Sequence, residues 1–206
     1  MSHLRPDLRQ RADEVVSLYP KQRSAMLPLL HLVQEQDGYV SEAGLVEVAE
    51  LTGTTAAEVR GTAAFYDMFH LEPVGRYVVG ICTNIACLLA GGQELLAHAS
   101  ESLDCPIGAT TSDGVFTLEE TECLADCNIA PCVQVNHRFV RTTTPAAFDA
   151  LVSDLRDGRR SDEVPVHGTL VRVKRAGTNR VPRAQITKER QTEREARQAR
   201  VDRETK

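Results

Sequence analysis

Hydrophobic residues recur every three or four positions along most of the first 65 residues, and this spacing predicts a helical N-terminal region. Two later stretches begin at good N-cap residues, Ser41 and Thr54 or Thr55. Each of them stops at a glycine, the residue that most often ends a helix. The predicted helices cover residues 7–18, 24–36, 41–53 and 54–61.

The hydrophobic period changes after the turn at Pro73 to Gly75. The run RYVVGIC, which ends at Cys82, is rich in β-branched residues and has the length of a strand. Beyond it the pattern predicts a helix over 91–103, a strand over 114–120, a hairpin formed by VQVN and HRFVR, and a helix from Thr144 to Gly158. This order of elements suits a small sheet covered by helices.

The apolar density falls after Gly158, where charged runs such as KERQTEREARQARVDRETK follow. Such a composition cannot bury enough apolar surface to offset the entropy lost on ordering. We therefore predict an α+β chain with three parts. A helical bundle covers residues 1–70, an α/β domain covers 71–157, and a basic tail, disordered or bound to a partner, covers 158–206.

The composition is that of an ordinary globular protein, because 42% of the 206 residues are apolar and 26% are charged. Residues 1–157 carry 10 basic and 22 acidic side chains, whereas residues 158–206 carry 14 basic and 7 acidic ones. An acidic body argues against nucleic-acid binding, which needs Lys and Arg at the phosphates. The charged N-terminus and the absence of a run of about 18 apolar residues predict neither a signal peptide nor a membrane span.

Six cysteines in a chain without an export signal indicate metal ligation or redox chemistry rather than a disulfide framework. Four of them form two pairs, Cys82-x₄-Cys87 directly after a predicted strand and Cys123-x₃-Cys127 in a later loop. Four thiolates that arrive in pairs can enclose a zinc ion, as in an interaction module, or a binuclear iron–sulfur core. The wide gaps favour a [2Fe-2S] cluster. A dithiol oxidoreductase is a third interpretation, although the chain lacks Cys-x-x-Cys spacing.

The other candidate residues favour structural roles. Cys105 and Cys132 stand outside the paired spacing, and we interpret both as buried structural thiols. Gly91 and Gly92 follow no nucleotide-binding frame, so we expect their loop to pack closely on the cluster. The six histidines show no metal-binding spacing. The segment AAFYDMFHLEP favours core filling, with an exposed partner patch as the alternative.

Four segments together resemble the E-subunit family of NADH-quinone oxidoreductase, the enzyme of respiratory complex I. They are LPLLHLVQEQDGYVS, AAFYDMFHLEPVGRY, YVVGICTNIACLLAGGQELL and FTLEETECLADCNIAPCVQVN. The resemblance covers about residues 20–157 and includes both cysteine pairs and the Ala-Pro that follows them, in order. Related subunits of NAD-linked hydrogenases and formate dehydrogenases share this motif, so the host complex stays open.

The resemblance implies a helical domain followed by a thioredoxin-like domain that holds one [2Fe-2S] cluster. It also implies the ligands of that cluster, which are Cys82, Cys87, Cys123 and Cys127. The chain would then be an electron-transfer subunit of an NADH:quinone oxidoreductase, a translocase, without a catalytic acid, base or nucleophile of its own.

The same resemblance implies the surroundings of the subunit. The cluster would exchange an electron with the FMN of a partner subunit, which also binds NADH. Other subunits of the peripheral arm would also contact this chain. It would bind no nucleic acid and would not insert directly into the membrane. The complex would lie on the cytoplasmic face of the inner (plasma) membrane.

Around the second cysteine pair this chain departs from the family pattern, which usually reads Cys-Leu-Gly-Ala-Cys-Gly. In this chain Ala125 replaces the first glycine of that pattern, Asp126 the alanine and Asn128 the second glycine. Alanine adopts positive φ less readily than glycine does, and Asp126 adds a negative charge beside the cluster. We expect both changes to affect the loop geometry and the reduction potential.

Overall fold

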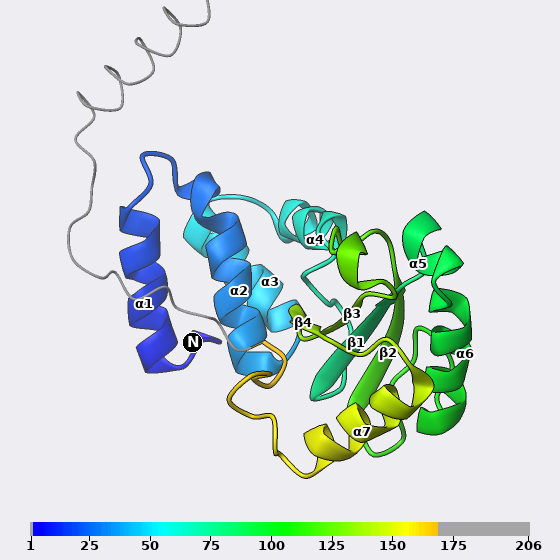
Figure 1. Cartoon of the computed structure of the whole chain (residues 1–206). Coiled ribbons are helices and arrows are strands. Elements are labelled where there is room, and N and C mark those ends of the chain that lie inside the picture. The colour runs from blue at the N-terminus through cyan, green and yellow to red at the C-terminus, as the bar shows by residue number, and fades with distance from the viewer. Residues whose placement is uncertain (1, 169–206) are drawn as a thin grey trace, which may run out of the picture. The chain divides into compact units, whose positions relative to one another are not determined.

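A computed structural model describes residues 2–168 of the chain (Figure 1). Its helices and mixed four-stranded sheet confirm the predicted α+β class. The N-terminal part is helical, as the hydrophobic spacing predicts. Its elements are α1 (Pro6–Ser17), the 3₁₀ turn η1 (Gln22–Ala25), α2 (Met26–Asp37), α3 (Glu42–Thr52) and α4 (Ala56–Phe65).

The predicted N-caps of α3 and α4 are confirmed. The hydroxyl of Ser41 accepts a hydrogen bond from a backbone N–H of α3, and Thr55 forms a capping box in α4. The prediction that the second of these helices ends at Gly61 is wrong, because α4 continues to Phe65. Gly61 keeps the helical conformation. The turn that follows it buries Ala63 on the same face of α4 as Val59.

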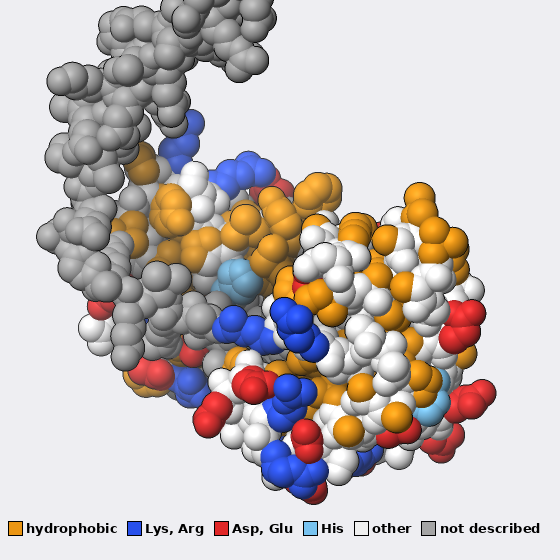
Figure 2. Space-filling model, viewed as in Figure 1, with side chains coloured by type: hydrophobic (Ala, Val, Ile, Leu, Met, Phe, Trp, Pro, Cys, Tyr) orange, Lys and Arg blue, Asp and Glu red, His pale blue; other side chains and the backbone are white. Residues whose placement is uncertain are grey.

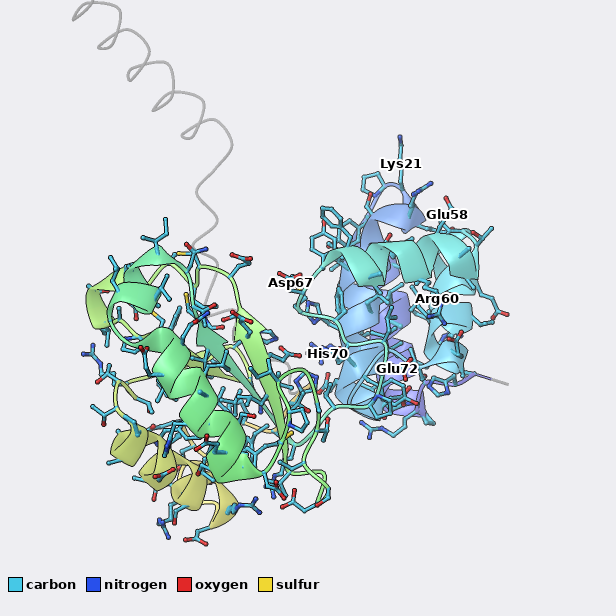
Figure 3. The ribbon with its side chains drawn as sticks, turned by 90° about the vertical axis from the view of Figure 1, so that its right-hand side faces the viewer. Lys21, Glu58, Arg60, Asp67, His70 and Glu72 are labelled. Carbon is cyan, nitrogen blue, oxygen red and sulfur yellow. The ribbon has the colours of Figure 1, made fainter. Side chains whose placement is uncertain are left out.

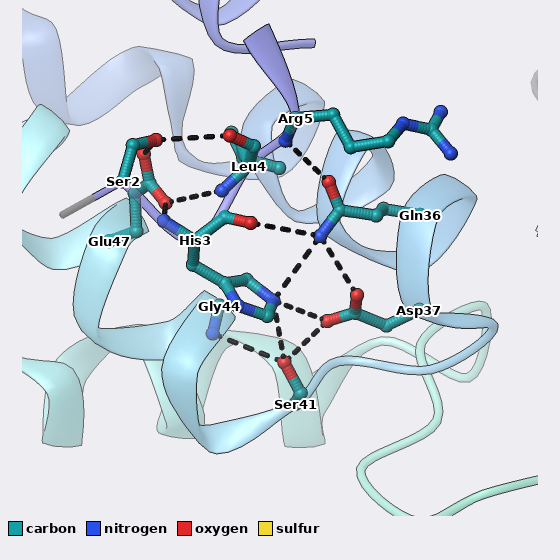
Figure 4. Close-up of polar contacts among 9 residues, drawn as sticks. All are labelled: Ser2, His3, Leu4, Arg5, Gln36, Asp37, Ser41, Gly44 and Glu47. Atoms are coloured by element: carbon teal, nitrogen blue, oxygen red, sulfur yellow. Dashed lines mark hydrogen bonds and ion pairs between the residues drawn. The ribbon is translucent and has the colours of Figure 1, made fainter.

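A buried carboxylate anchors the start of the chain on α3 (Figure 4). Glu47 accepts hydrogen bonds from the backbone N–H groups of His3 and Leu4, and from the hydroxyl of Ser2. Burial alone would raise the pKa of Glu47, but these hydrogen bonds outweigh it and hold the pKa below its usual value. The first residues thereby fix α1 against the other helices.

The second part of the chain is built on a sheet with strand order β2-β1-β3-β4. β1 and β2 are parallel, whereas the β1–β3 and β3–β4 pairs are antiparallel. The strands are β1 (Tyr77–Cys82), β2 (Phe116–Thr121), β3 (Val133–Val135) and β4 (Arg138–Val140). The remaining elements are α5 (Ile85–Leu89), α6 (Gly92–Leu103), η2 (Cys127–Ile129) and α7 (Pro145–Arg156).

One face of this sheet packs on α6 and α7 (Figure 1). Alternate residues of each strand point to that face, as expected for a pleated strand with period two. The helical part has an apolar core of its own. The strand residues in the sheet's core are Tyr77, Val79, Ile81, Phe116, Leu118, Val133, Val135 and Val140.

The residues that follow α7 differ from the expectation of a mobile tail. Val164 is only 1% exposed and belongs to the core of the sheet domain. The carbonyl of Pro165 accepts a hydrogen bond from the side chain of Asn136 at 2.8 Å. The backbone N–H of His167 donates to the backbone carbonyl of Arg76 at 2.9 Å. The rest of the predicted tail, residues 169–206, lies outside the described residues. The boundaries of the three parts stay a prediction.

The linker between the helices and the sheet is held by Gln34 of α2. Its side chain donates to the carbonyl of Met68 at 2.8 Å and accepts from His70 N–H at 3.0 Å. The imidazole of His70 lies 3.6 Å from the carboxylate of Glu119 on β2. Figure 3 shows Asp67 and His70 on the side of the helical part that faces the sheet. No helix within residues 2–168 has the length and apolar character of a membrane span.

Several imidazoles lie near this linker. The ring of His70 lies edge-on to that of His167, with 4.9 Å between the ring centroids. Removal from water, together with repulsion from neighbouring imidazoles, lowers the pKa of His167 to about 4. Burial also lowers the pKa of three further imidazoles, those of His31, His70 and His137.

We expect the free energy of unfolding to fall as the pH decreases from 6.5 towards 4. In that pH window the imidazoles of the unfolded chain take up protons that those of the folded chain do not. Acid therefore favours the unfolded state. Burial raises the pKa of Glu119; this acts in the opposite direction, but one carboxyl opposes several imidazoles. Urea-unfolding midpoints at about pH 7.5 and about pH 5 measure the effect. His167→Gln should reduce the difference. Equal wild-type midpoints would contradict this expectation.

Candidate metal centre

The first cysteine pair frames a short loop and helix at the end of β1. Cys82 is the last residue of the strand. Asn84 then caps α5, because its side-chain oxygen accepts a hydrogen bond from Ile85 N–H at 2.9 Å. Cys87 lies within α5, and each thiol of the pair is only 1% exposed. The sequence did not predict α5, since five residues are too few to show a helical period.

The second pair lies on the segment that follows β2, and both of its thiols are exposed. The Sγ atoms of Cys123 and Cys127 are 4.0 Å apart. Their hydrogen bond raises the pKa of the Cys127 thiol, and the charges of Cys87 and Cys82 act in the same direction. Thiols of both pairs therefore contribute to this shift.

The parallel pairing of β1 with β2 brings the two pairs together. Cys82 at the end of β1 lies opposite Thr121 at the end of β2, and Cys123 follows two residues later. The carboxyl ends of neighbouring parallel strands are the usual place for a site in an α/β sheet. Two side-chain hydrogen bonds cross between these segments: Thr83 Oγ1 to Glu120 Oε1 at 2.5 Å, and Asn84 Nδ2 to Glu122 Oε2 at 2.9 Å.

The arrangement of the thiols distinguishes between kinds of metal centre. Within residues 2–168, no group of three or more His, Cys, Asp or Glu side chains is gathered as it would be around one metal ion. A structural zinc ion requires four ligands around a single centre, whereas a [2Fe-2S] core divides its four thiolates between two irons. The gaps of four and three residues within the two pairs fit the cluster better than they fit zinc. The set of four ligands stays a prediction.

The two remaining cysteines occupy different surroundings. Cys105 lies in the core of the sheet domain, where its thiol donates to the carbonyl of Ala109 at 3.2 Å. Cys132 packs with Cys82 and Cys87 in a small apolar cluster. Burial, together with the neighbouring Cys87, raises the pKa of the Cys132 thiol to about 12. Spacing alone placed Cys132 outside the site, because its position depends on the pairing of β3 with β1.

Gly92, at the start of α6, packs against the backbone of the first cysteine pair. A Cβ atom on Gly92 would lie 2.7 Å from the carbonyl oxygen of Cys82 and 2.8 Å from that of Cys87. These distances are too short for any real side chain. Only a glycine therefore allows α6 to begin this close to the cysteine loop, and packing on the cluster itself stays a prediction.

Exposed apolar side chains lie beside the cysteine pairs, over α5 (Figure 2). They are Ile85, Leu88 and Leu89, and Leu89 is 84% exposed. In the aromatic segment before the sheet, Phe69 fills the helical core while Phe65 is 77% exposed. Core filling is therefore confirmed for Phe69, and the partner patch stays a prediction.

Ala125 adopts a left-handed conformation between the two exposed cysteines, with φ of +62°. This conformation costs an L-residue with a side chain roughly 1–2 kcal/mol, whereas the added chain freedom of glycine costs about 0.4–1 kcal/mol. We therefore expect Ala125→Gly to raise the free energy of unfolding by about 0.5–1 kcal/mol. Urea unfolding measures the change. Ala90→Gly is the control, since φ is −93° there and stability should fall. A less stable Ala125→Gly variant would contradict the expectation.

Comparisons with known proteins identify the family of this chain. The family model for thioredoxin-like [2Fe-2S] ferredoxins matches residues 12–156. The E-type subunit of the NADH-quinone oxidoreductase of Mycobacterium tuberculosis (strain ATCC 25618 / H37Rv) is 46% identical over 145 residues, which are 70% of this chain and 58% of the relative. A second relative, from the NADH-quinone oxidoreductase of Thermus thermophilus, is 38% identical over 159 residues, 76% of this chain and 88% of the relative.

A solved structure shares the fold. The crystal structure of an NAD⁺-reducing [NiFe]-hydrogenase in the H₂-reduced state superimposes with a TM-score of 0.56 and 25% identity. The match covers 66% of this chain and 23% of the hydrogenase chain. This chain thus spans less than a quarter of that protein, and 58% of the length of the mycobacterial relative.

Proposed function

This chain belongs to the thioredoxin-like [2Fe-2S] ferredoxin family, and we propose that it is the electron-transfer subunit of the NADH-oxidising module of an NADH-quinone oxidoreductase. The observation that carries the proposal is the arrival of two thiol pairs at the carboxyl ends of β1 and β2. The names of the mycobacterial and Thermus relatives support the choice of complex. The proposed cluster ligands are Cys82, Cys87, Cys123 and Cys127.

The residues of this chain would hold the cluster and control access to it. A [2Fe-2S] cluster accepts and releases one electron when it is bound. The buried pair supplies two sulfur donors that water does not reach, and the exposed pair leaves the other side open. Leu124 and Ala130 pack against the buried thiols and lower the local polarity. This proposal assigns no proton transfer to any residue of the chain.

The partner in this proposal is a subunit that binds FMN and NADH, which this chain does not bind. Contiguous exposed apolar side chains, such as those over α5, are typical of protein contacts. A subunit of an NAD⁺-reducing hydrogenase is the second candidate, and the shared fold of the solved hydrogenase supports it. In either complex the chain would lie in the cytoplasm, on the cytoplasmic face of the membrane in the respiratory case.

Co-purification of the full-length chain from its own cells tests the proposal. We expect a flavin-bearing subunit to accompany the chain, and NADH to reduce the cluster in this complex but not in the isolated chain. Quinone-dependent oxidation of NADH indicates the respiratory complex, whereas nickel together with reduction by H₂ indicates the hydrogenase. A flavin-containing complex in which NADH leaves the cluster oxidised would contradict the electron-transfer role.

The charge of Asp126 gives a prediction for the reduction potential. Its carboxylate is near enough to the centre to raise the pKa of the Cys132 thiol, and a nearby anion disfavours the addition of an electron. A unit charge at about 6 Å in an effective dielectric near 20 contributes at most about 3 kcal/mol before screening. We expect Asp126→Asn to raise the potential by tens of millivolts, and Asp7→Asn in α1 to leave it unchanged. A redox titration that shows an unchanged or lower potential for Asp126→Asn would reject this prediction.

A further inference from the structure

Three hydrogen bonds converge on Cys132, which lies directly before β3 and is 4% exposed. Its carbonyl oxygen accepts the N–H of Cys82 at 3.0 Å. Its own N–H donates to Sγ of Cys87, with the nitrogen 3.4 Å from the sulfur. Its thiol donates to the carbonyl oxygen of Asp126, with the sulfur 3.0 Å from the oxygen. One residue thus contacts the segments of both cysteine pairs.

The thiol of Cys132 holds the segment that carries the second pair. Asp126 stands between Ala125, whose backbone is left-handed, and Cys127. In the described part of the chain, no other hydrogen bond joins residues 124–127 to a residue outside 123–129. The side chain of Cys132 therefore fixes this exposed segment relative to the rest of the site.

The backbone of Cys132 acts on the first pair. An N–H group that donates to a thiolate sulfur stabilises its negative charge, and such hydrogen bonds are among the factors that set the potential of iron–sulfur centres. The antiparallel pairing of Ile81 with Val133 places this N–H beside the first cysteine loop. A side-chain substitution leaves the N–H in place, so the effects of side chain and backbone are separable.

We propose that Cys132 is a positioning residue that holds the two proposed ligand pairs at a fixed separation, through its thiol towards Asp126 and through its backbone towards Cys82 and Cys87. This inference rests on the proposed function, since it assumes that the four paired cysteines bind the cluster. The thiol is not itself a ligand in this proposal. It contributes one hydrogen bond that an apolar residue of similar size cannot make.

The test compares two substitutions of this thiol in the full-length chain. Cys132→Val keeps the volume and removes the donor, whereas Cys132→Ser keeps a donor. Loss of a hydrogen bond of typical strength corresponds to about a five-fold change in an equilibrium. We expect Cys132→Val to release iron to a chelator about five-fold faster than wild type and to alter the EPR line shape of the reduced cluster. Cys132→Ser should restore values close to wild type.

Cys105→Val is the matched control, because Cys105 is also buried and its thiol also donates to a backbone carbonyl. It should leave the EPR line shape and the iron release unchanged. In the metal-free chain, amide hydrogen exchange of residues 123–129 should be about five-fold faster in Cys132→Val alone. Cys132→Val with wild-type exchange, line shape and iron release would overturn the positioning role, as would Cys132→Ser that behaves like Cys132→Val. A wild-type chain that binds no iron would instead overturn the proposed function, and this inference with it.

Discussion

Alanine at any one of the four paired cysteines should abolish the [2Fe-2S] centre. Each substitution removes one of four thiolates that divide between two irons, and no other described side chain completes a group around a metal ion. The visible absorption and the EPR signal should disappear, and bound iron should fall from about two per chain to nearly none. The four variants are Cys82→Ala, Cys87→Ala, Cys123→Ala and Cys127→Ala.

The two unpaired cysteines are the controls for this experiment. Cys105→Ala should keep the cluster unchanged, since its thiol lies in the core of the sheet domain. Cys132→Ala should keep two irons, which it holds less firmly. Loss of the cluster in Cys132→Ala together with retention in Cys127→Ala would show that the ligand assignment is wrong.

Gly92→Ala should distort the loop that carries Cys82 and Cys87, although Gly92 is not itself in that loop. The added methyl group would meet the carbonyl oxygens of Cys82 and Cys87 at less than 3 Å, so α6 or the loop has to move. Overpacking of this kind costs about 1–3 kcal/mol. We expect a lower free energy of unfolding and incomplete uptake of iron, measured by urea unfolding and by iron analysis.

Gly61→Ala is the matched control, because a Cβ atom at this helical position in α4 meets nothing within 4 Å. Replacing a glycine inside a helix with alanine should raise stability by about 0.5–1 kcal/mol. Iron uptake should stay at the wild-type level. Equal stability and iron content in Gly92→Ala and wild type would mean that the contact between α6 and the loop does not constrain the site.

Local patterns were enough to predict most of the elements and the pairing of the cysteines along the chain. The cap at Ser41, the strand that ends at Cys82 and the hairpin after Pro131 were all visible as short-range signals. The helix α5 was missed because it spans too few residues to show a period. The end of α4 was misplaced because a glycine inside a helix and a glycine that ends one look alike in sequence.

Contacts between distant segments could not be predicted from the sequence. The role of Cys132 depends on the antiparallel pairing of Ile81 with Val133, which spacing does not reveal. The contact between His70 and His167 joins residues that lie almost a hundred positions apart. Val164 belongs to the core of the sheet domain, but charged residues precede it in the sequence, so this segment resembles a tail.

EPR spectroscopy of the anaerobically purified full-length chain, combined with metal analysis, tests the central claim most directly. After reduction with dithionite, we predict one signal that integrates to about one spin per chain, with about two irons and two acid-labile sulfides bound. A colourless, EPR-silent protein with about one zinc per chain would contradict the claim, and so would a metal-free protein with four reactive thiols at the paired cysteines.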